Sequence, residues 1–236
     1  MIQMRIKVVG KKHLGKYLIK ELSRKSEVNS HNIKKEVREG MSKVYTIVEE
    51  NPDVIVNTKF VTDVDLCEIA QNLVFSVGVG PLIEDIDYCK KNKKKLVYIS
   101  SIFVKDPVNV YSKMKLLCEE MIQKELEDYL IIRTDTMYSK ERTFNWEKGA
   151  VDVACFPTNV EDLAVAIKVL IYLNKKGIID VTGYQKFSKY EFIRRLSNPN
   201  VKPVKVKDLK LMAKRSKNIH SDVDAAKDIG LIMREI

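Results

Sequence analysis

The chain has 236 residues, of which 45 % are hydrophobic and 31 % are charged, and its formal net charge is +10. That length suits one large domain, or one domain with a small appendage, and the composition is typical of a soluble globular protein. The longest apolar runs are far shorter than the roughly 20 residues of a membrane span, and no signal-peptide pattern opens the chain. We therefore expect a cytoplasmic protein without a membrane partner.

The distribution of cysteine, histidine and basic residues argues against a metal site and against a nucleic-acid interface. The four cysteines and three histidines are widely scattered, so their spacing indicates no metal site, and we expect the cysteines to be reduced structural thiols. The positive net charge could attract nucleic acid, but no basic stripe interleaved with aromatic residues accompanies it. A nucleic-acid-associated protein is therefore only a third alternative, behind the two functions considered below.

The N-terminal segment reads as a strand, a glycine turn and a helix. Met4 to Val9 is a short apolar strand that stops at Gly10, and a helical spacing of apolar residues begins at Lys16, directly after Gly15. In such a unit the backbone N–H groups and the helix N-terminus can face a pyrophosphate. The Gly-x-x-x-x-Gly spacing has only two of the three glycines of the dinucleotide fingerprint. An ordinary strand-to-helix turn is therefore the open alternative.

The next part of the chain alternates strand-like and helix-like segments. A second strand is short and weak at Ser26 to Asn29, and Ile33 to Glu49 reads as a helix that stops before Pro52. Asp53 to Asn57 is a buried type of strand that ends in a polar residue. The helical segments that follow run from Cys67 to Phe75 and from Pro81 to Asn92.

The strand from Leu96 to Ser101 and the segment after it carry the chemistry. A strand that ends in Ser101 delivers a hydroxyl to the carboxyl edge of the sheet, where ligands of open α/β sheets bind. Tyr111 and Lys115 follow on a helical segment, four residues apart and therefore on one helix face. A lysine ammonium one turn away lowers the pKa of the phenol, which suits proton transfer to or from a substrate oxygen. Ser101 could hold that same oxygen by a hydrogen bond.

Tyr172 and Lys176 show the same spacing and serve as an internal control. This pair follows a helical segment and has no serine-ended strand before it, so we interpret it as a solvated helix face. With 10 Tyr and 42 Lys plus Arg in the chain, one or two such pairs are expected by chance. The spacing of Tyr111 and Lys115 is therefore ambiguous by itself, and their position after Ser101 is what favours a site.

The remaining segments continue the alternation and then loosen. Leu130 to Thr134 is another strand. After it we expect a polar loop at 139–148, a strand at 151–156, a helix at 160–173, a strand at 178–181, a short helix at 188–196 and a last helical piece from Asp222. The alternation predicts the α/β class, with a parallel sheet flanked by helices and a small second lobe.

Several short blocks occur in an order that is informative as a set. They are Pro52 to Asn57 with Val61 to Asp65, Val97 to Ser101, Asn109 to Tyr111 with Lys115, Ile132 to Thr134, Pro157-Thr158 with Glu161 to Ala164, Val181 to Gly183, and Lys214 through Asp222. As a set they resemble the extended short-chain dehydrogenase/reductases, and within them the dTDP-4-dehydrorhamnose reductase branch. The resemblance implies a Rossmann-type dinucleotide-binding domain at 1–138, and at 139–236 a trimmed, reduced substrate lobe interleaved with the last sheet strands.

The resemblance also implies a reaction, a cofactor and a set of residue roles. NADPH or NADH would reduce a ketone of a nucleotide-sugar substrate. Ser101 would hydrogen-bond the ketone oxygen, Tyr111 would protonate it, and Lys115 would lower the pKa of the phenol and hold the ribose. The positions implied to bind the cofactor are Gly10, Lys11, Lys12, Leu14, Gly15, Asn57, Thr58, Lys59 and Lys115. No metal is implied.

The chain departs from the family pattern in several places, two of which bear directly on ligand binding. Its phosphate loop is one residue shorter, with Lys12 or His13 in place of the middle glycine, and the segment between Tyr138 and Pro157 is truncated. A second function therefore stays open, that of a non-catalytic relative with a degenerate cofactor loop. Such a protein would act as a regulatory or assembly subunit, as a related regulatory subunit of methionine adenosyltransferase does. A homodimer is compatible with either function.

Overall fold

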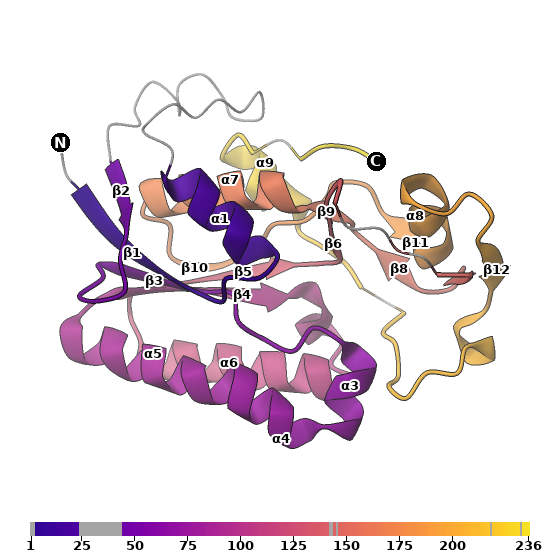
Figure 1. Ribbon diagram of the computed structural model, residues 1–236, viewed down its shortest axis with the longest axis horizontal. Helices are drawn as coiled ribbons and strands as arrows, with labels where there is room; N and C mark the ends of the chain where they lie inside the picture. The colour runs from indigo at the N-terminus through magenta and orange to yellow at the C-terminus, as the bar shows by residue number, and fades with distance from the viewer. Residues whose placement is uncertain (1–2, 24–43, 142–143, 145, 218, 232) are drawn as a thin grey trace.

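A six-stranded sheet forms the centre of the protein (Figure 1). The computed structural model describes residues 3–23, 44–141, 144, 146–217, 219–231 and 233–236. In spatial order the strands are β10 (Gly177–Asp180), β5 (Tyr129–Thr134), β4 (Lys95–Ser101), β3 (Val54–Asn57), β1 (Gln3–Val9) and β2 (Val44–Ile47). Every neighbouring pair runs parallel, so the carboxyl ends of all these strands lie at one edge.

Helices cover both faces of this sheet, which confirms the predicted α/β class (Figure 1). One layer contains α1 (Leu14–Ser23) and α7 (Val160–Tyr172), and the other contains α5 (Gly80–Asn92) and α6 (Val110–Glu125). Because side chains alternate along a strand, Val97 of β4 packs toward the first layer while its neighbour Leu96 packs toward the second.

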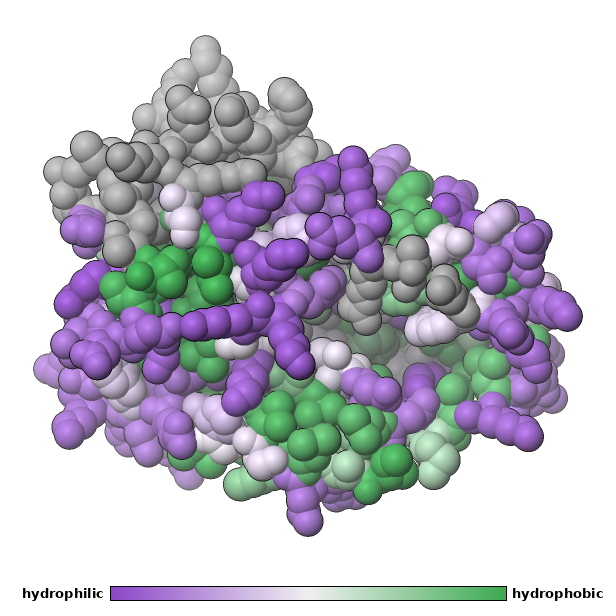
Figure 2. Space-filling view, in the orientation of Figure 1, coloured by the Kyte–Doolittle hydropathy of each residue, from purple (hydrophilic) through white to green (hydrophobic). Residues whose placement is uncertain are grey.

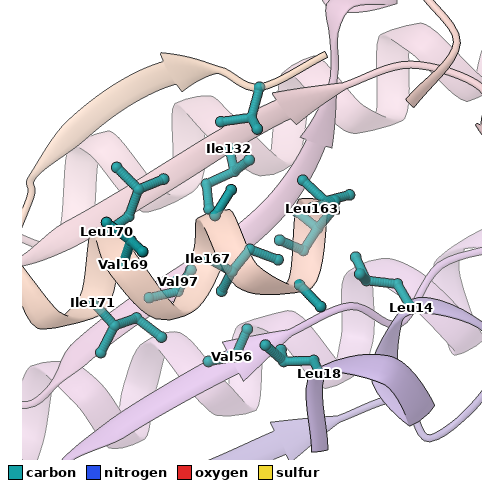
Figure 3. Close-up of a cluster of buried hydrophobic side chains, with 14 of the residues drawn as sticks. Leu14, Leu18, Val56, Val97, Ile132, Leu163, Ile167, Val169, Leu170 and Ile171 are labelled. Carbon is teal, nitrogen blue, oxygen red and sulfur yellow. The ribbon is translucent and has the colours of Figure 1, made fainter. Parts of the chain in front are cut away.

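The larger core lies between the sheet and the layer of α1 and α7 (Figure 3). Leu18 and Ile167 belong to these helices, Val56 and Val97 to the strands below them, and each is 0 % exposed. Burying one such side chain contributes roughly 1.5–3 kcal/mol to folding. β4 is buried along its whole length, and this fixes the position of Ser101 at its end.

A run of short helices leads from the end of β3 into α5. It consists of α3 (Val64–Ile69), α4 (Gln71–Val74) and the π-helical turn η1 (Phe75–Val79). Asp63 caps α3, because its carboxylate accepts the N–H groups of Asp65 and Leu66, each at 3.0 Å. The π-helical turn is a type of distortion that often marks functional sites.

Apolar side chains gather on the surface over α3 and α4 (Figure 2). Ile69, Leu73 and Phe75 are 64, 39 and 52 % exposed. Much of the remaining surface in this view is hydrophilic, in keeping with a chain that is 31 % charged. The homodimer that the sequence leaves possible is not tested by this surface.

The C-terminal part adds small paired strands and short helices beside the sheet (Figure 1). The paired strands are β6 (Met137–Tyr138) with β9 (Thr158–Asn159), β7 (Lys148–Ala150) with β12 (Lys202–Val204), and β8 (Ala154–Cys155) with β11 (Phe187–Ser188). The short helices are α8 (Lys189–Leu196), the 3-10 turn η3 (Val206–Asp208) and α9 (Val223–Asp228). Phe187, Phe192 and Ile193 form part of a separate small core in this region. Within the described ranges, no helix has the length and apolar character needed to cross a bilayer.

The structure differs from the predicted elements in several segments. The helix predicted from Cys67 to Phe75 begins earlier, at Val64, and is divided at Ala70 into α3 and α4. The helix predicted from Ile33 to Glu49 is wrong at its end, where β2 pairs in parallel with β1. The sequence Val-Tyr-Thr-Ile of β2 is rich in β-branched and aromatic residues, which favour a strand once an edge is available to pair with. The strand predicted at 151–156 shrinks to β8 because a bend precedes it. The weak strand predicted at Ser26 to Asn29 lies outside the described residues.

The division between residues 1–138 and 139–236 stays a prediction. β10 and α7 both come from the second stretch, and they complete the sheet and its first helical layer. The small paired strands also come from that stretch, except β6, which lies at the end of the first one. The later part of the chain therefore contributes both to the central sheet and to the smaller lobe.

Candidate active site at the carboxyl ends of β1, β3 and β4

Ser101 lies where β4 leaves the middle of the sheet. Its Cα pairs in register with that of Thr134 on β5, and both side chains are buried. The Ser101 hydroxyl accepts the N–H of Phe103 at 3.3 Å, which caps the 3-10 helix η2 (Ile102–Lys105). This cap holds the hydroxyl at the edge of the sheet where ligands of parallel α/β sheets bind.

The first turn of α6 is fixed by a capping box just before Tyr111. The Asn109 side chain accepts the N–H of Ser112 at 2.9 Å, and the Ser112 hydroxyl accepts the N–H of Asn109 at 3.3 Å. Asn109 also donates its side-chain amide to the carbonyl of Lys214 at 2.8 Å. This bond ties the start of α6 to the C-terminal part of the chain. It thereby helps to fix the position of Tyr111 relative to Ser101.

The structure brings Tyr111 and Ser101 together, as the sequence predicts. Burial raises the pKa of Tyr111 to about 12, although a side-chain hydrogen bond with Ser101 acts in the opposite direction. Nearby Cys67 and Asp135 raise it further. The predicted lowering of the phenol pKa is therefore wrong for this structure. At neutral pH the phenol keeps its proton and can donate it.

Lys115 lies one turn from Tyr111 but its ammonium points elsewhere. Its Nζ donates to the carbonyl of Ile99 at 2.7 Å, and the side chain is 4 % exposed. The same Nζ lies 4.1 Å from the ring centroid of Phe60 and 4.5 Å from that of Tyr98. Burial lowers the pKa of Lys115 to about 8. The spacing correctly placed this residue near Tyr111, but the ammonium is not available to stabilise a phenolate in this arrangement.

Gly10 and Gly15 meet at the turn between β1 and α1. Gly10 has a φ of +92°, a conformation that favours glycine. A Cβ at Gly15 would lie 1.7 Å from the Gly10 carbonyl oxygen, so only glycine lets the helix approach the strand end this closely. The Gly15 N–H donates to the Lys12 carbonyl and the Lys16 N–H to the His13 carbonyl, each at 3.0 Å. These two amides are therefore directed at the loop itself.

The lysines and the leucine predicted in this loop have different environments. Lys11 and Lys12 are exposed, and Lys11 forms a 2.9 Å surface ion pair with Glu49. Leu14 is 3 % exposed and belongs to the main core, so its side chain cannot line a ligand site. Positive charge at the loop thus comes from Lys11 and Lys12.

The polar side chains at the end of β3 form hydrogen bonds within the protein. Asn57 donates its amide to Asp85 at 2.7 Å and accepts the N–H of Lys59 at 3.0 Å. The Thr58 hydroxyl lies 2.9 Å from the Gly10 carbonyl and donates to it, which ties the ends of β3 and β1 together. Lys59 is exposed. The side chains of Asn57 and Thr58 therefore hold the edge of the site in place, and Lys59 adds a further positive charge beside it.

The control pair Tyr172 and Lys176 is not a second site. α7 ends at Tyr172, which packs against the main core, while Lys176 lies beyond the helix and pairs with Asp128 at 3.3 Å. The interpretation as one solvated helix face is wrong, because the two residues do not share a helix. The four cysteines are free and buried, as expected of structural thiols.

A buried ion pair behind the site was not found by sequence reasoning. Glu119 is 0 % exposed and accepts two N–H groups of Arg133, the closer at 2.6 Å. The Ser100 hydroxyl donates to the same carboxylate at 2.5 Å. Glu119 lies one turn beyond Lys115 on α6, so the helical spacing could have revealed it. The pair joins α6 to β4 and β5 directly beneath Ser101.

The residues at this edge fit a dinucleotide in most respects. Thr134, opposite Ser101, has a buried hydroxyl oxygen with no hydrogen-bond partner among the described residues, which suits a polar ligand. The exposed Lys12 and Lys59 suit a pyrophosphate. The nicotinamide end would require one change, because the ring of Phe60 covers the Lys115 ammonium.

Comparison with protein families gives a match over nearly the whole chain. Residues 4–235 match the family described as the RmlD substrate binding domain. Among curated proteins, the chain is 27 % identical over 168 residues to the spore coat polysaccharide biosynthesis protein SpsK of Bacillus subtilis (strain 168). That alignment covers 60 % of the chain and 59 % of this relative, so the chain spans well under two thirds of its length.

Solved structures with the same fold include several dTDP-4-dehydrorhamnose reductases. The one from Clostridium acetobutylicum has a TM-score of 0.73 at 22 % identity, covering 91 % of this chain and 88 % of that one. The one from Bacillus anthracis, in complex with NADP, has a TM-score of 0.71 at 22 % identity, with coverages of 92 % and 89 %. A hypothetical one from Sulfolobus tokodaii has a TM-score of 0.75 at 24 % identity, with coverages of 96 % and 94 %. These likenesses establish the fold.

Proposed function

The chain belongs to the RmlD substrate binding domain family, and on that premise we propose that it is an NAD(P)-dependent reductase similar to dTDP-4-dehydrorhamnose reductase. Its substrate would be a ketone of a nucleotide sugar in the cytoplasm. Within this proposal, residues 1–138 hold NADPH or NADH and residues 139–236 supply the substrate lobe. The NADP complex of the Bacillus anthracis reductase, which shares this fold, supports the choice of cofactor.

The observation that carries the proposal is the contact between the Ser101 hydroxyl and the Tyr111 phenol at the carboxyl edge of a parallel sheet. Ser101 can hold a substrate carbonyl oxygen while Tyr111 donates a proton to it. A bound reduced nicotinamide would supply the hydride. With its pKa raised to about 12, the phenol carries its proton at neutral pH and gives it readily to the more basic alkoxide that forms.

The second function, that of a non-catalytic relative, rests on two observations. The Phe60 ring lies over Lys115, and the first amides of α1 bond back to the glycine turn. The first feature reduces the space for a dinucleotide, and the second leaves fewer backbone N–H groups free to bind its phosphates. The buried Thr134 hydroxyl and the contact between Ser101 and Tyr111 favour the reductase, because a scaffold has no need of unpaired buried hydroxyls at a ligand edge.

Titration with NADPH and NADH, followed by a turnover assay, tests the proposal. We expect the fluorescence of at least one reduced dinucleotide to change on binding at submillimolar concentration. We then expect the bound dinucleotide to be oxidised when dTDP-4-dehydrorhamnose is added. Failure of both dinucleotides to bind at millimolar concentration would contradict the reductase function and favour the non-catalytic relative.

A further inference from the structure

Phe60 contacts two of the three residues proposed to carry the reaction. Its ring lies face-on to the Lys115 ammonium, with Nζ 4.1 Å from the ring centroid. The same ring meets the ring of Tyr111 edge-on, with centroids 5.7 Å apart and planes at 83°. Phe60 follows the end of β3 in the chain and is far in sequence from both partners. Phe60 therefore connects the segment after β3 to the first turns of α6.

The Phe60 ring is seated on a residue that has no side chain. A Cβ at Gly78 would lie 2.5 Å from Cδ2 and 2.7 Å from Cε2 of the ring. Gly78 belongs to the π-helical turn η1 and is buried. A side chain at residue 78 would therefore overlap the Cδ2–Cε2 side of the ring, whose face holds the Lys115 ammonium. The space for this position of the ring exists only because residue 78 is glycine.

Among the described residues, the Lys115 ammonium has no carboxylate partner at hydrogen-bond distance, and it donates to a backbone carbonyl instead. It donates to the Ile99 carbonyl and lies between the aromatic faces of Phe60 and Tyr98. Such cation–π contacts are strongest when the cation is shielded from water, as it is here. The Tyr98 ring is 1 % exposed and belongs to the core, whereas Phe60 is only half-buried. Moving the Phe60 ring away from Lys115 would therefore expose less of the core than moving the Tyr98 ring.

We propose that Phe60 controls access of the dinucleotide to Lys115 and Tyr111, its ring leaving the ammonium when the dinucleotide binds. The inference rests on the proposed reductase function. In the closed arrangement the ring occupies the space next to Nζ that a ligand hydroxyl would have to enter. The energy of the ring–ammonium contact then opposes binding, which lowers the apparent affinity for the dinucleotide.

Two glycines in the same helical run provide a test and its matched control. Gly78→Ala places a methyl group where the Phe60 ring now lies, so we expect it to push the ring off Lys115. At Gly80 a Cβ would meet only the Phe75 carbonyl oxygen, at an ordinary 3.5 Å. Gly80→Ala is the same chemical change without contact with Phe60. Phe60→Ala removes the ring directly. It therefore tests the same point even if Gly78→Ala perturbs the helix.

The first readout is the accessibility of Lys115 in the dinucleotide-free protein. Labelling with an amine-reactive acylating reagent at alkaline pH, quantified by mass spectrometry of the Lys115 peptide, measures it. We expect Gly78→Ala and Phe60→Ala to increase labelling at Lys115 by roughly tenfold or more, because the residue is otherwise buried. Gly80→Ala should label like the wild type. Equal labelling of Lys115 in all four folded proteins would overturn the proposal.

The second readout is the binding of NADPH, followed by its fluorescence. We expect the two opening variants to bind roughly tenfold more tightly, with a faster association rate, and Gly80→Ala to match the wild type. A wild type that binds NADPH with the same affinity and association rate as both opening variants would overturn the role of Phe60 and leave the reductase function intact. Absence of binding in every protein would instead overturn the reductase function, and the access role with it.

Discussion

Replacing Tyr111 with phenylalanine is expected to reduce turnover by about 10²–10⁴-fold while changing dinucleotide affinity by less than about twofold. The substitution removes only the phenolic hydroxyl, which is the proton donor placed against Ser101. The ring remains, and with it the edge-on contact with Phe60. Steady-state rates with NADPH and dTDP-4-dehydrorhamnose, together with NADPH binding by fluorescence, separate the two effects.

Tyr172→Phe is the matched control for this experiment. Tyr172 has the same sequence relation to a lysine, but it ends α7 and packs against the main core, away from Ser101. Its substitution should leave both turnover and binding within about twofold of the wild type. If Tyr111→Phe retained full turnover, or if both variants lost it equally, Tyr111 would not be the proton donor.

Replacing Glu119 with alanine is expected to destabilise the folded protein by about 3–5 kcal/mol. Glu119 is fully buried and receives two N–H groups of Arg133 as well as the hydroxyl of Ser100. Its removal leaves the Arg133 guanidinium partly buried without its acceptor, which is the main source of the cost. The free energy of unfolding from chemical denaturation measures the effect.

Glu125→Ala on the same helix is the control for Glu119→Ala. Glu125 forms an ion pair of similar length, 2.7 Å, with Lys90, but both side chains are exposed to water. Solvent screens that pair, so its loss should produce little measurable change. Comparable stability of Glu119→Ala and the wild type would contradict the structural role assigned to the buried pair. Glu119→Gln retains an oxygen acceptor, so its free energy of unfolding should lie between those of Glu119→Ala and the wild type.

Much of the fold could be predicted because its central strands are short buried apolar runs. β3, β4 and β5 each stand out in this way, and helices of amphipathic spacing separate them. β2 could not be predicted, since its sequence lies at the end of a helix-like stretch. Its strand conformation depends on pairing with β1, a contact between segments far apart in the chain. Local periodicity contains no information about such pairing.

The proximity of Ser101, Tyr111 and Lys115 was predictable from the sequence, whereas the electrostatics around them was not. The four-residue spacing places Tyr111 and Lys115 on one face of α6, and the end of β4 places Ser101 beside them. The direction of the Lys115 ammonium depends on the Ile99 carbonyl and on the ring of Phe60, which lies in the segment after β3. The sign of the Tyr111 pKa shift depends on burial, which only the packed structure determines.

A crystal structure of the protein grown or soaked with NADPH would show whether this edge of the sheet binds the dinucleotide. We expect the nicotinamide beside the Tyr111 phenol and the Ser101 hydroxyl, the pyrophosphate at the turn of Gly10 and Gly15, and the Phe60 ring displaced from Lys115. Crystals at saturating NADPH that retain the ring on Lys115 and show no dinucleotide along this edge would contradict this expectation. So would a dinucleotide bound at a different surface.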